Sequence, residues 1–267
     1  MLIVSLSRVY SISLRQFYSF RQKPFRLLSL VYSPAFEFAM WFFITKYFYE
    51  IGGKQSGLIE VLLGAVILWG FFSRIQQNIC VQFLEDIRSR NLLNLFVSPL
   101  SISEYLAGFI VISFMTSGLS LLGIAFTAAI FHLYNIATVG LWLLAYLAVL
   151  FLFGWSVGIF TTAMILRFGR TGEALLGSIP SILAALSAVF YSVDTLPTFL
   201  RPLCSVIPSS YIFEGMRQIA AFGRADLAEW LIAFSLSLFY FGLSIVFFYR
   251  THQSVVKSGL LTRLMTE

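Results

Sequence analysis

The sequence predicts an all-α integral membrane protein with six transmembrane helices in a single domain, residues 1–267. Of its 267 residues, 59% are apolar and 11% are charged, whereas soluble domains average about 45–50% apolar and about 25% charged residues. The apolar residues form runs of about 20, the length that a helix needs to cross a hydrocarbon core of about 30 Å. Because these runs do not alternate with polar residues, strands of a membrane barrel are excluded.

The composition also excludes several kinds of chemistry. The net charge of +6 comes from basic residues that flank the apolar runs, where they orient helices and contact anionic lipid, so nucleic acid is not an expected partner. Cys80 and Cys204 have neither metal-site nor disulfide-framework spacing. Gly52-Gly-Lys-Gln55 lacks the upstream glycine and the hydroxyl of a phosphate-binding loop. We therefore expect no cofactor in this chain and no ATP hydrolysis by the chain itself.

Residues 1–23 predict an amphipathic helix that lies in the cytoplasmic headgroup layer. Its polar residues recur every three or four positions, and its apolar residues lie largely on the other side. The polar set is Arg8, Ser11, Arg15, Ser19 and Gln22, and the apolar set is Leu6, Val9, Tyr10, Leu14 and Phe17. Pro24 should end this helix. The alternative is a frayed basic leader that only sets the topology.

The six apolar runs follow this segment and set the predicted topology. Thirteen of the 18 Lys and Arg residues lie in segments on the side of the N-terminus, and five lie in segments on the other side. By the positive-inside tendency, both termini lie in the cytoplasm and the chain crosses the cytoplasmic (inner) membrane. The predicted spans are residues 27–48, 58–80, 104–131, 139–166, 174–193 and 228–249.

The segment after the second span is the densest polar stretch. It predicts a short amphipathic helix across the base of the spans, because its apolar residues have helical spacing and its polar residues lie largely on other faces. The apolar set is Ile87, Leu92, Leu95 and Phe96, and the polar set is Asp86, Arg88, Arg90 and Asn94. Pro99 should end it, and Ser101 or Ser103 can cap the next helix ahead of Glu104.

Two further motifs leave alternatives open. Gly154-Trp-Ser-Val-Gly158 fits both the Gly-x-Ser-x-Gly pattern of a hydrolase and the Gly-x-x-x-Gly pattern of packed membrane helices. Packing is favoured, because Ser156 lies within a continuous apolar run. Glu37 is the deepest charge in a predicted span, and an ionisable group in a membrane is a functional candidate. A proton-coupled secondary transporter using Glu37 is therefore one alternative, and an intramembrane hydrolase using Ser156 is another.

Two stretches resemble a known family. Leu92-Leu-Asn-Leu-Phe-Val-Ser-Pro-Leu-Ser-Ile-Ser-Glu-Tyr-Leu-Ala-Gly108 is similar to the segment after the second span of ABC-2-type exporter permeases. The connection from Val189 through Pro202 to the segment Ile207-Pro-Ser-Ser-Tyr-Ile-Phe-Glu-Gly-Met-Arg217 resembles that family's link between its fifth and sixth spans. One departure is Arg90-Asn-Leu-Leu, where the family usually has Gly-Thr-Leu-Glu.

The resemblance implies the membrane subunit of an ATP-driven exporter. Two permeases would pair as a homodimer or heterodimer, and each would dock a separate cytoplasmic ATPase that binds ATP and Mg²⁺. The implied substrates are polysaccharides, lipid-linked glycans, drugs or other hydrophobic molecules. The residues implied in ATPase coupling lie in residues 85–96 and in the 167–173 loop: Glu85, Asp86, Arg88, Arg90, Asn91, Asn94 and Arg170.

The connection at 194–227 has three prolines between short apolar pieces, which is typical of re-entrant half-helices on the outer side. A plain outer loop is the alternative. The residues expected at an outer gate are Pro197, Pro202, Pro208, Tyr211, Glu214 and Arg217.

Overall fold

The computed structural model describes residues 5–22, 24–52, 56–89, 100–130 and 141–258, and these residues form helices, turns and bends with no strand. The prediction of an all-α fold is confirmed. The longer helices are α1 (Leu6–Arg21), α2 (Pro24–Gly52), α3 (Ser56–Arg88), α5 (Ile102–Ile130), α7 (Leu141–Phe168), α8 (Leu175–Leu186), α10 (Pro208–Phe222) and α11 (Leu227–Lys257). The short ones are η1 (Gly169–Ala174), η2 (Val193–Thr195) and α9 (Arg201–Cys204).

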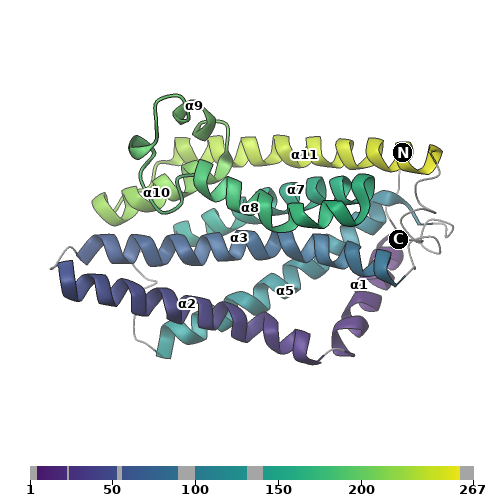
Figure 1. Ribbon diagram of the computed structural model, residues 1–267, viewed down its shortest axis with the longest axis horizontal. Coiled ribbons are helices and arrows are strands. Elements are labelled where there is room, and N and C mark those ends of the chain that lie inside the picture. The colour runs from purple at the N-terminus through teal and green to yellow at the C-terminus, as the bar shows by residue number, and fades with distance from the viewer. Residues whose placement is uncertain (1–4, 23, 53–55, 90–99, 131–140, 259–267) are drawn as a thin grey trace.

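The long helices follow the long axis of the molecule (Figure 1). Among the described residues, four helices are long and apolar enough to cross a membrane, with windows at Leu27–Tyr47, Ile102–Thr127, Trp142–Phe168 and Leu227–Lys257. These windows agree with four of the predicted spans. Helix α3 is 33 residues long and runs beside them, but Arg74, Gln76 and Asn78 make its second half more polar.

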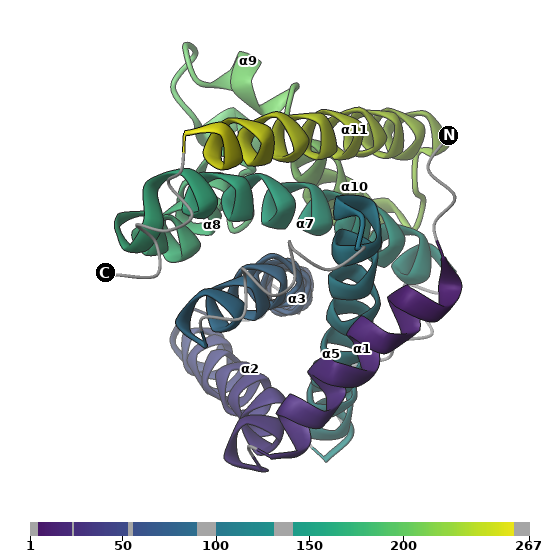
Figure 2. The ribbon, with the colours of Figure 1, turned by 90° about the vertical axis from the view of Figure 1, so that its right-hand side faces the viewer.

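Helix α3 lies between two groups of helices, with α7 and α11 on one side and α2 and α5 on the other (Figures 1 and 2). Small residues bring α7 close to α3. A Cβ atom added at Gly154 would lie 2.8 Å from Cγ2 of Ile75, and one at Gly158 would lie 3.1 Å from Cδ1 of Ile79. The Gly-x-x-x-Gly pair therefore lies at the α3–α7 contact, as close helix packing requires.

The predicted span at 174–193 is wrong in extent, because α8 ends at Leu186 after 12 residues. The chain turns at Ala188, which has a φ of +49° and is buried. The hydroxyl of Ser187, just before this turn, is hydrogen-bonded to the hydroxyl of Ser209 at 2.6 Å, so the end of α8 meets the start of α10. The apolar residues after Leu186 belong to this partly buried turn and not to a helix. Apolarity alone does not distinguish a buried turn from a membrane-spanning helix.

Helix α1 lies crosswise to the long helices, at the end of the bundle where α3 and α11 finish (Figures 1 and 2). Its apolar side faces outward, with Leu6 84% exposed and Tyr10 65% exposed. Ile12 and Gln16, on the opposite side, are buried against the bundle. The predicted helix within residues 1–23 is therefore confirmed, and its outward apolar side suits a lipid headgroup layer.

Candidate functional site

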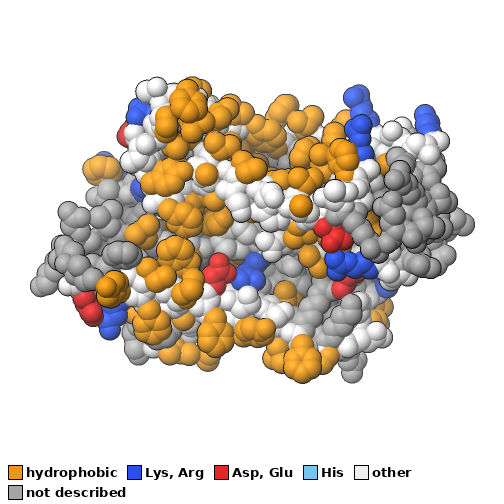
Figure 3. Space-filling view, viewed as in Figure 1, with side chains coloured by type: hydrophobic (Ala, Val, Ile, Leu, Met, Phe, Trp, Pro, Cys, Tyr) orange, Lys and Arg blue, Asp and Glu red, His pale blue; other side chains and the backbone are white. Residues whose placement is uncertain are grey.

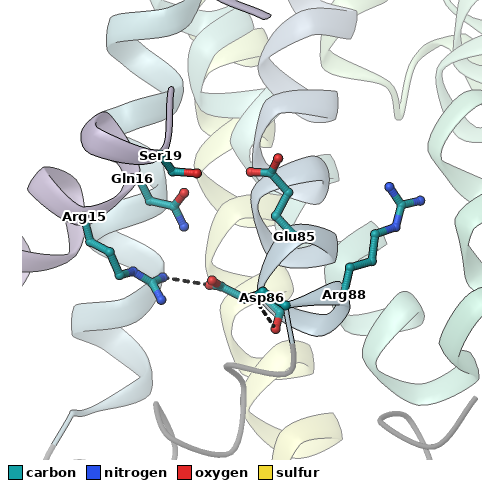
Figure 4. Close-up of a pocket in the computed structure, with 7 residues that line it drawn as sticks. Arg15, Gln16, Ser19, Glu85, Asp86 and Arg88 are labelled. Carbon is teal, nitrogen blue, oxygen red and sulfur yellow. Dashed lines mark hydrogen bonds and ion pairs between the residues drawn. The ribbon is translucent and has the colours of Figure 1, made fainter. Parts of the chain in front are cut away.

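A cavity of about 420 Å³ lies between α1 and the end of α3 (Figure 4). Charged and polar side chains of both helices line it. The lining residues are Arg15, Gln16 and Ser19 of α1 and Glu85, Asp86, Arg88 and Ser89 of α3. This end of the bundle is the candidate site for coupling to a cytoplasmic partner.

Asp86 joins three helices through its carboxylate. Its Oδ2 atom accepts hydrogen bonds from Nη2 of Arg15 at 2.8 Å and from the hydroxyl of Tyr105 at 2.9 Å, and Figure 4 shows the Arg15 side chain directed at Asp86. Burial raises the pKa of Asp86 above its ordinary value, against the lowering influence of Arg15 and the Tyr105 hydroxyl. The charge of Asp86 is therefore directed inward, toward α1 and α5, and not toward a docked partner.

Glu104 makes a second junction between α1 and α5. Its Oε2 atom accepts the backbone N–H of Ser101 at 2.9 Å, and its own N–H donates to Oγ of Ser101 at 3.2 Å. This reciprocal pair is a capping box and confirms Ser101 as the cap of α5. The other oxygen, Oε1, accepts the backbone N–H of Ser5 at 2.9 Å, and Arg8 forms an ion pair with Glu104 at 3.5 Å.

A close contact between Ile12 and Gly108 completes the attachment of α1. A Cβ atom on Gly108 would lie only 2.6 Å from Cγ2 of Ile12, so glycine is needed for this approach. Together with the contacts of Asp86 and Glu104, this contact fixes α1 along its length to α3 and α5. We call this set the α1 clamp: Ser5, Arg8, Ile12, Arg15, Asp86, Glu104, Tyr105 and Gly108.

Arg88 differs from Asp86, although the two are only two residues apart. Its side chain is 64% exposed and donates to Oε2 of Glu173 in η1 at 2.9 Å. This ion pair connects the end of α3 to the segment that follows α7. The structure therefore brings together, at one exposed point, the two segments in which the sequence placed coupling contacts.

The structure describes only some of the remaining predicted coupling residues. Glu85 lines the cavity and is half-buried. Arg90, Asn91 and Asn94 lie outside the described residues, and for Arg170 only the backbone, within η1, is described.

The predicted outer-gate residues lie around α9 and α10. Pro197 and Pro202 are exposed, whereas Pro208 is buried at the first position of α10. Arg217 donates to Oε2 of Glu214 at 3.0 Å and to the backbone oxygen of Ala188 at 3.1 Å, so α10 is tied to the turn after α8.

In the same region, the hydroxyl of Tyr211 donates to the backbone oxygen of Ser205 at 2.9 Å, which joins α10 to the residue after α9.

The structure also places Ser156 and Glu37, the residues of the alternative hydrolase and proton-coupled transporter hypotheses. Ser156 is buried and lines an apolar cavity of about 440 Å³ between α7, α8 and α11, whose lining residues include no acidic or basic side chain. Glu37 of α2 forms an ion pair with Arg74 of α3 at 3.0 Å.

Several partners were missed by sequence reasoning. The roles of Arg15, Tyr105 and Glu173 depend on contacts between positions 19 to 85 residues apart, for which one sequence carries no signal. The sequence predicts the polar face of α1 but places it in the headgroup layer, whereas Arg15 and Gln16 of that helix contact the bundle. Only the capping box at Ser101 and Glu104 could be read locally.

Comparison with known proteins agrees with this architecture. The family model described as "ABC-2 family transporter protein" matches residues 38–249, most of the chain. No curated protein matches the sequence. The matched region begins within α2 and ends within α11. The chain belongs to the ABC-2 family of transporter proteins.

Proposed function

We propose that this chain is the membrane-spanning permease subunit of an ATP-driven exporter. It pairs with a second permease, identical or related, to form the translocation path, and each permease docks a separate ATPase that binds ATP and Mg²⁺. Family membership and the apolar helices support the transport role. The observation that carries the coupling assignment is the exposed Arg88–Glu173 pair, which joins two loop-flanking segments at one end of the bundle.

The same proposal includes the topology. Helix α3 supplies the second crossing, and α8 with α10 supplies the fifth, as two half-helices that meet at Ser187 and Ser209. This gives six crossings in the cytoplasmic membrane with both termini in the cytoplasm. Helix α1 lies at the cytoplasmic surface, because its exposed side carries Leu6 and Tyr10.

Photo-cross-linking tests the docking surface. Ser89 is exposed next to Arg88 and lines the cavity at the end of α3. A benzoylphenylalanine introduced at Ser89 should cross-link to the ATPase in membranes that contain both subunits. Phe222 is 77% exposed at the opposite end of the molecule and provides a matched control position.

The expected result is a permease–ATPase product from position 89 and none from position 222. A product from position 222 alone would reverse the proposed orientation. The absence of a product from both positions, with both subunits in the membrane, would remove the docking role from the end of α3.

A further inference from the structure

The ion pair between Glu37 and Arg74 lies about midway along the length of the bundle. Arg74 is 14 residues before the end of α3 at Arg88, which places it about 21 Å from that end at 1.5 Å per residue. Glu37 is 13 residues into α2, a similar depth from the same end. Both side chains remain accessible, with 19% of Arg74 and 47% of Glu37 exposed. The pair therefore opens onto a surface at mid-membrane depth.

This surface continues along one side of α3. Positions three or four apart on that side are exposed or half-buried, whereas most of the positions between them are buried. The partly exposed positions are Gly70, Ser73, Arg74, Gln77, Val81, Glu85 and Arg88. Because a charged guanidinium in lipid is costly, this side of α3 must face water or protein. Figure 3 shows the molecule from this side, with charged side chains near the middle and toward the right-hand end among hydrophobic ones.

Arg74 has unused capacity to bind an anion. Among the described residues, its one hydrogen-bonding partner is Oε2 of Glu37, reached through a single nitrogen at 3.0 Å. A guanidinium carries five N–H donors in a fork that fits a carboxylate or phosphate through two parallel bonds. An incoming anionic group can therefore make two bonds where Glu37 makes one.

The asymmetry of the pair favours an anion over a cation. A cation that captured Glu37 would leave Arg74 charged and unpaired, since a guanidinium does not lose its proton in proteins. An anion that captured Arg74 would leave Glu37, which is the more exposed partner and can be hydrated. Binding of an anion therefore leaves the less costly unpaired charge.

An apolar surface lies beside the charge. Trp41 is one helical turn beyond Glu37 on α2, a rise of about 6 Å, and its ring stacks on Phe190 with a centroid distance of 5.8 Å. On α3, Gly70 is one turn beyond Arg74, and a Cβ atom placed there would meet nothing within 4 Å. An aromatic surface and an open space therefore adjoin the ion pair on its outer side.

We propose that Arg74 binds the anionic group of an amphipathic substrate, displacing Glu37, while the apolar part of the substrate lies against Trp41 and Phe190. This inference rests on the proposed function, because it places the site in the translocation path. It narrows the substrate class to molecules that combine a carboxylate, sulfate or phosphate with an apolar group.

Binding of three pyrene probes to the full-length permease in nanodiscs tests the inference without any ATPase. The probes are 1-pyrenebutyrate, 1-pyrenebutanol and 1-pyrenebutylamine, which share the apolar group and differ in charge. Energy transfer from tryptophan to pyrene reports binding, and nanodiscs without protein correct for partition into lipid. We expect pyrenebutyrate to bind about tenfold more tightly than pyrenebutanol, because a charge-assisted pair contributes on the order of 1.4 kcal/mol or more.

The variants separate Arg74 from a general charge effect. Arg74→Gln should abolish the preference for pyrenebutyrate, and Arg74→Lys should reduce it, because lysine keeps the charge without the fork. Lys46→Gln, which removes an exposed cation from α2, should leave it unchanged. If Arg74→Gln does not fold, the relative affinities of the three probes for the wild-type protein still test whether the site prefers an anion.

Equal binding of pyrenebutyrate and pyrenebutanol, or a preference for pyrenebutylamine that Glu37→Gln removes, would overturn the inference. Either result leaves the cross-link at position 89 unaffected, so failure of the anion site is distinguishable from failure of the coupling assignment.

Discussion

Asp86 and Arg88 are two residues apart on α3, yet they occupy opposite environments. Asp86 has a side chain that is 7% exposed and is held by Arg15 and Tyr105. Arg88 has a side chain that is 64% exposed, and its ion-pair partner among the described residues is Glu173. The charge-rich end of α3 therefore has a buried side and an exposed side. Its inward side fixes α1 to the bundle, and its outward side is available to a partner.

The energetic consequences differ in the same way. Removing one member of a buried ion pair leaves a charge without compensation and costs about 3–5 kcal/mol. An exposed pair contributes about 0–1 kcal/mol, because water and salt screen it. Substitutions at the α1 clamp should therefore act on stability, and substitutions at Arg88 and Glu173 should act on partner binding.

The largest expected effect is at Arg15. The Arg15→Ala variant leaves the buried carboxylate of Asp86 without its cation, and we expect a loss of about 3 kcal/mol in the free energy of unfolding. Unfolding of the purified permease in nanodiscs measures this loss. The Arg88→Ala variant is the matched control, with a loss of less than about 1 kcal/mol. Equal losses in the two variants would break the division between the inward and outward sides.

A smaller effect concerns pH. Because burial raises the pKa of Asp86 in the folded protein, the folded state binds this proton more readily than the unfolded state. The contribution of Asp86 to stability is therefore greatest below its ordinary pKa and falls as the pH rises through the raised value.

Asp86→Asn removes this titration. Between about pH 4 and pH 7, the stability of the wild type relative to Asp86→Asn should decrease as the pH rises. The Glu173→Gln variant, changed on the exposed side, should keep the wild-type profile. A wild-type advantage that grows with pH would show that Arg15 outweighs burial at this carboxylate.

The sequence predicted the helices better than it predicted their partners. The apolar runs located α2, α5, α7 and α11, because a long apolar run in a membrane has few structures other than a helix. The prediction of a span at 174–193 is wrong in extent, because residues buried in the turn around Ala188 are apolar just as residues of a span are. Asp86 was assigned to a partner, because periodicity gives the face of a helix but not which other helix covers it.

The smallest expected effect on stability accompanies the largest expected effect on coupling, at Arg88 and Glu173. Arg88→Glu places two carboxylates side by side, and the double variant Arg88→Glu with Glu173→Arg restores the pair with its polarity reversed. Both variants should insert normally, because the remaining basic residues keep the positive-inside bias. Arg224→Glu, an exposed site at the opposite end, is the control for the change in charge.

The most direct measurement of the central claim is recovery of the ATPase with the purified permease, wild type and these variants side by side. If the ATPase docks through charges complementary to those of Arg88 and Glu173, neither Arg88→Glu nor the double variant should recover the ATPase. In both variants reversed charges would face like charges across the contact. Arg224→Glu should retain it. Recovery of the ATPase by the double variant at the wild-type level would mean that only the internal pair matters, and that the ATPase does not dock on these side chains.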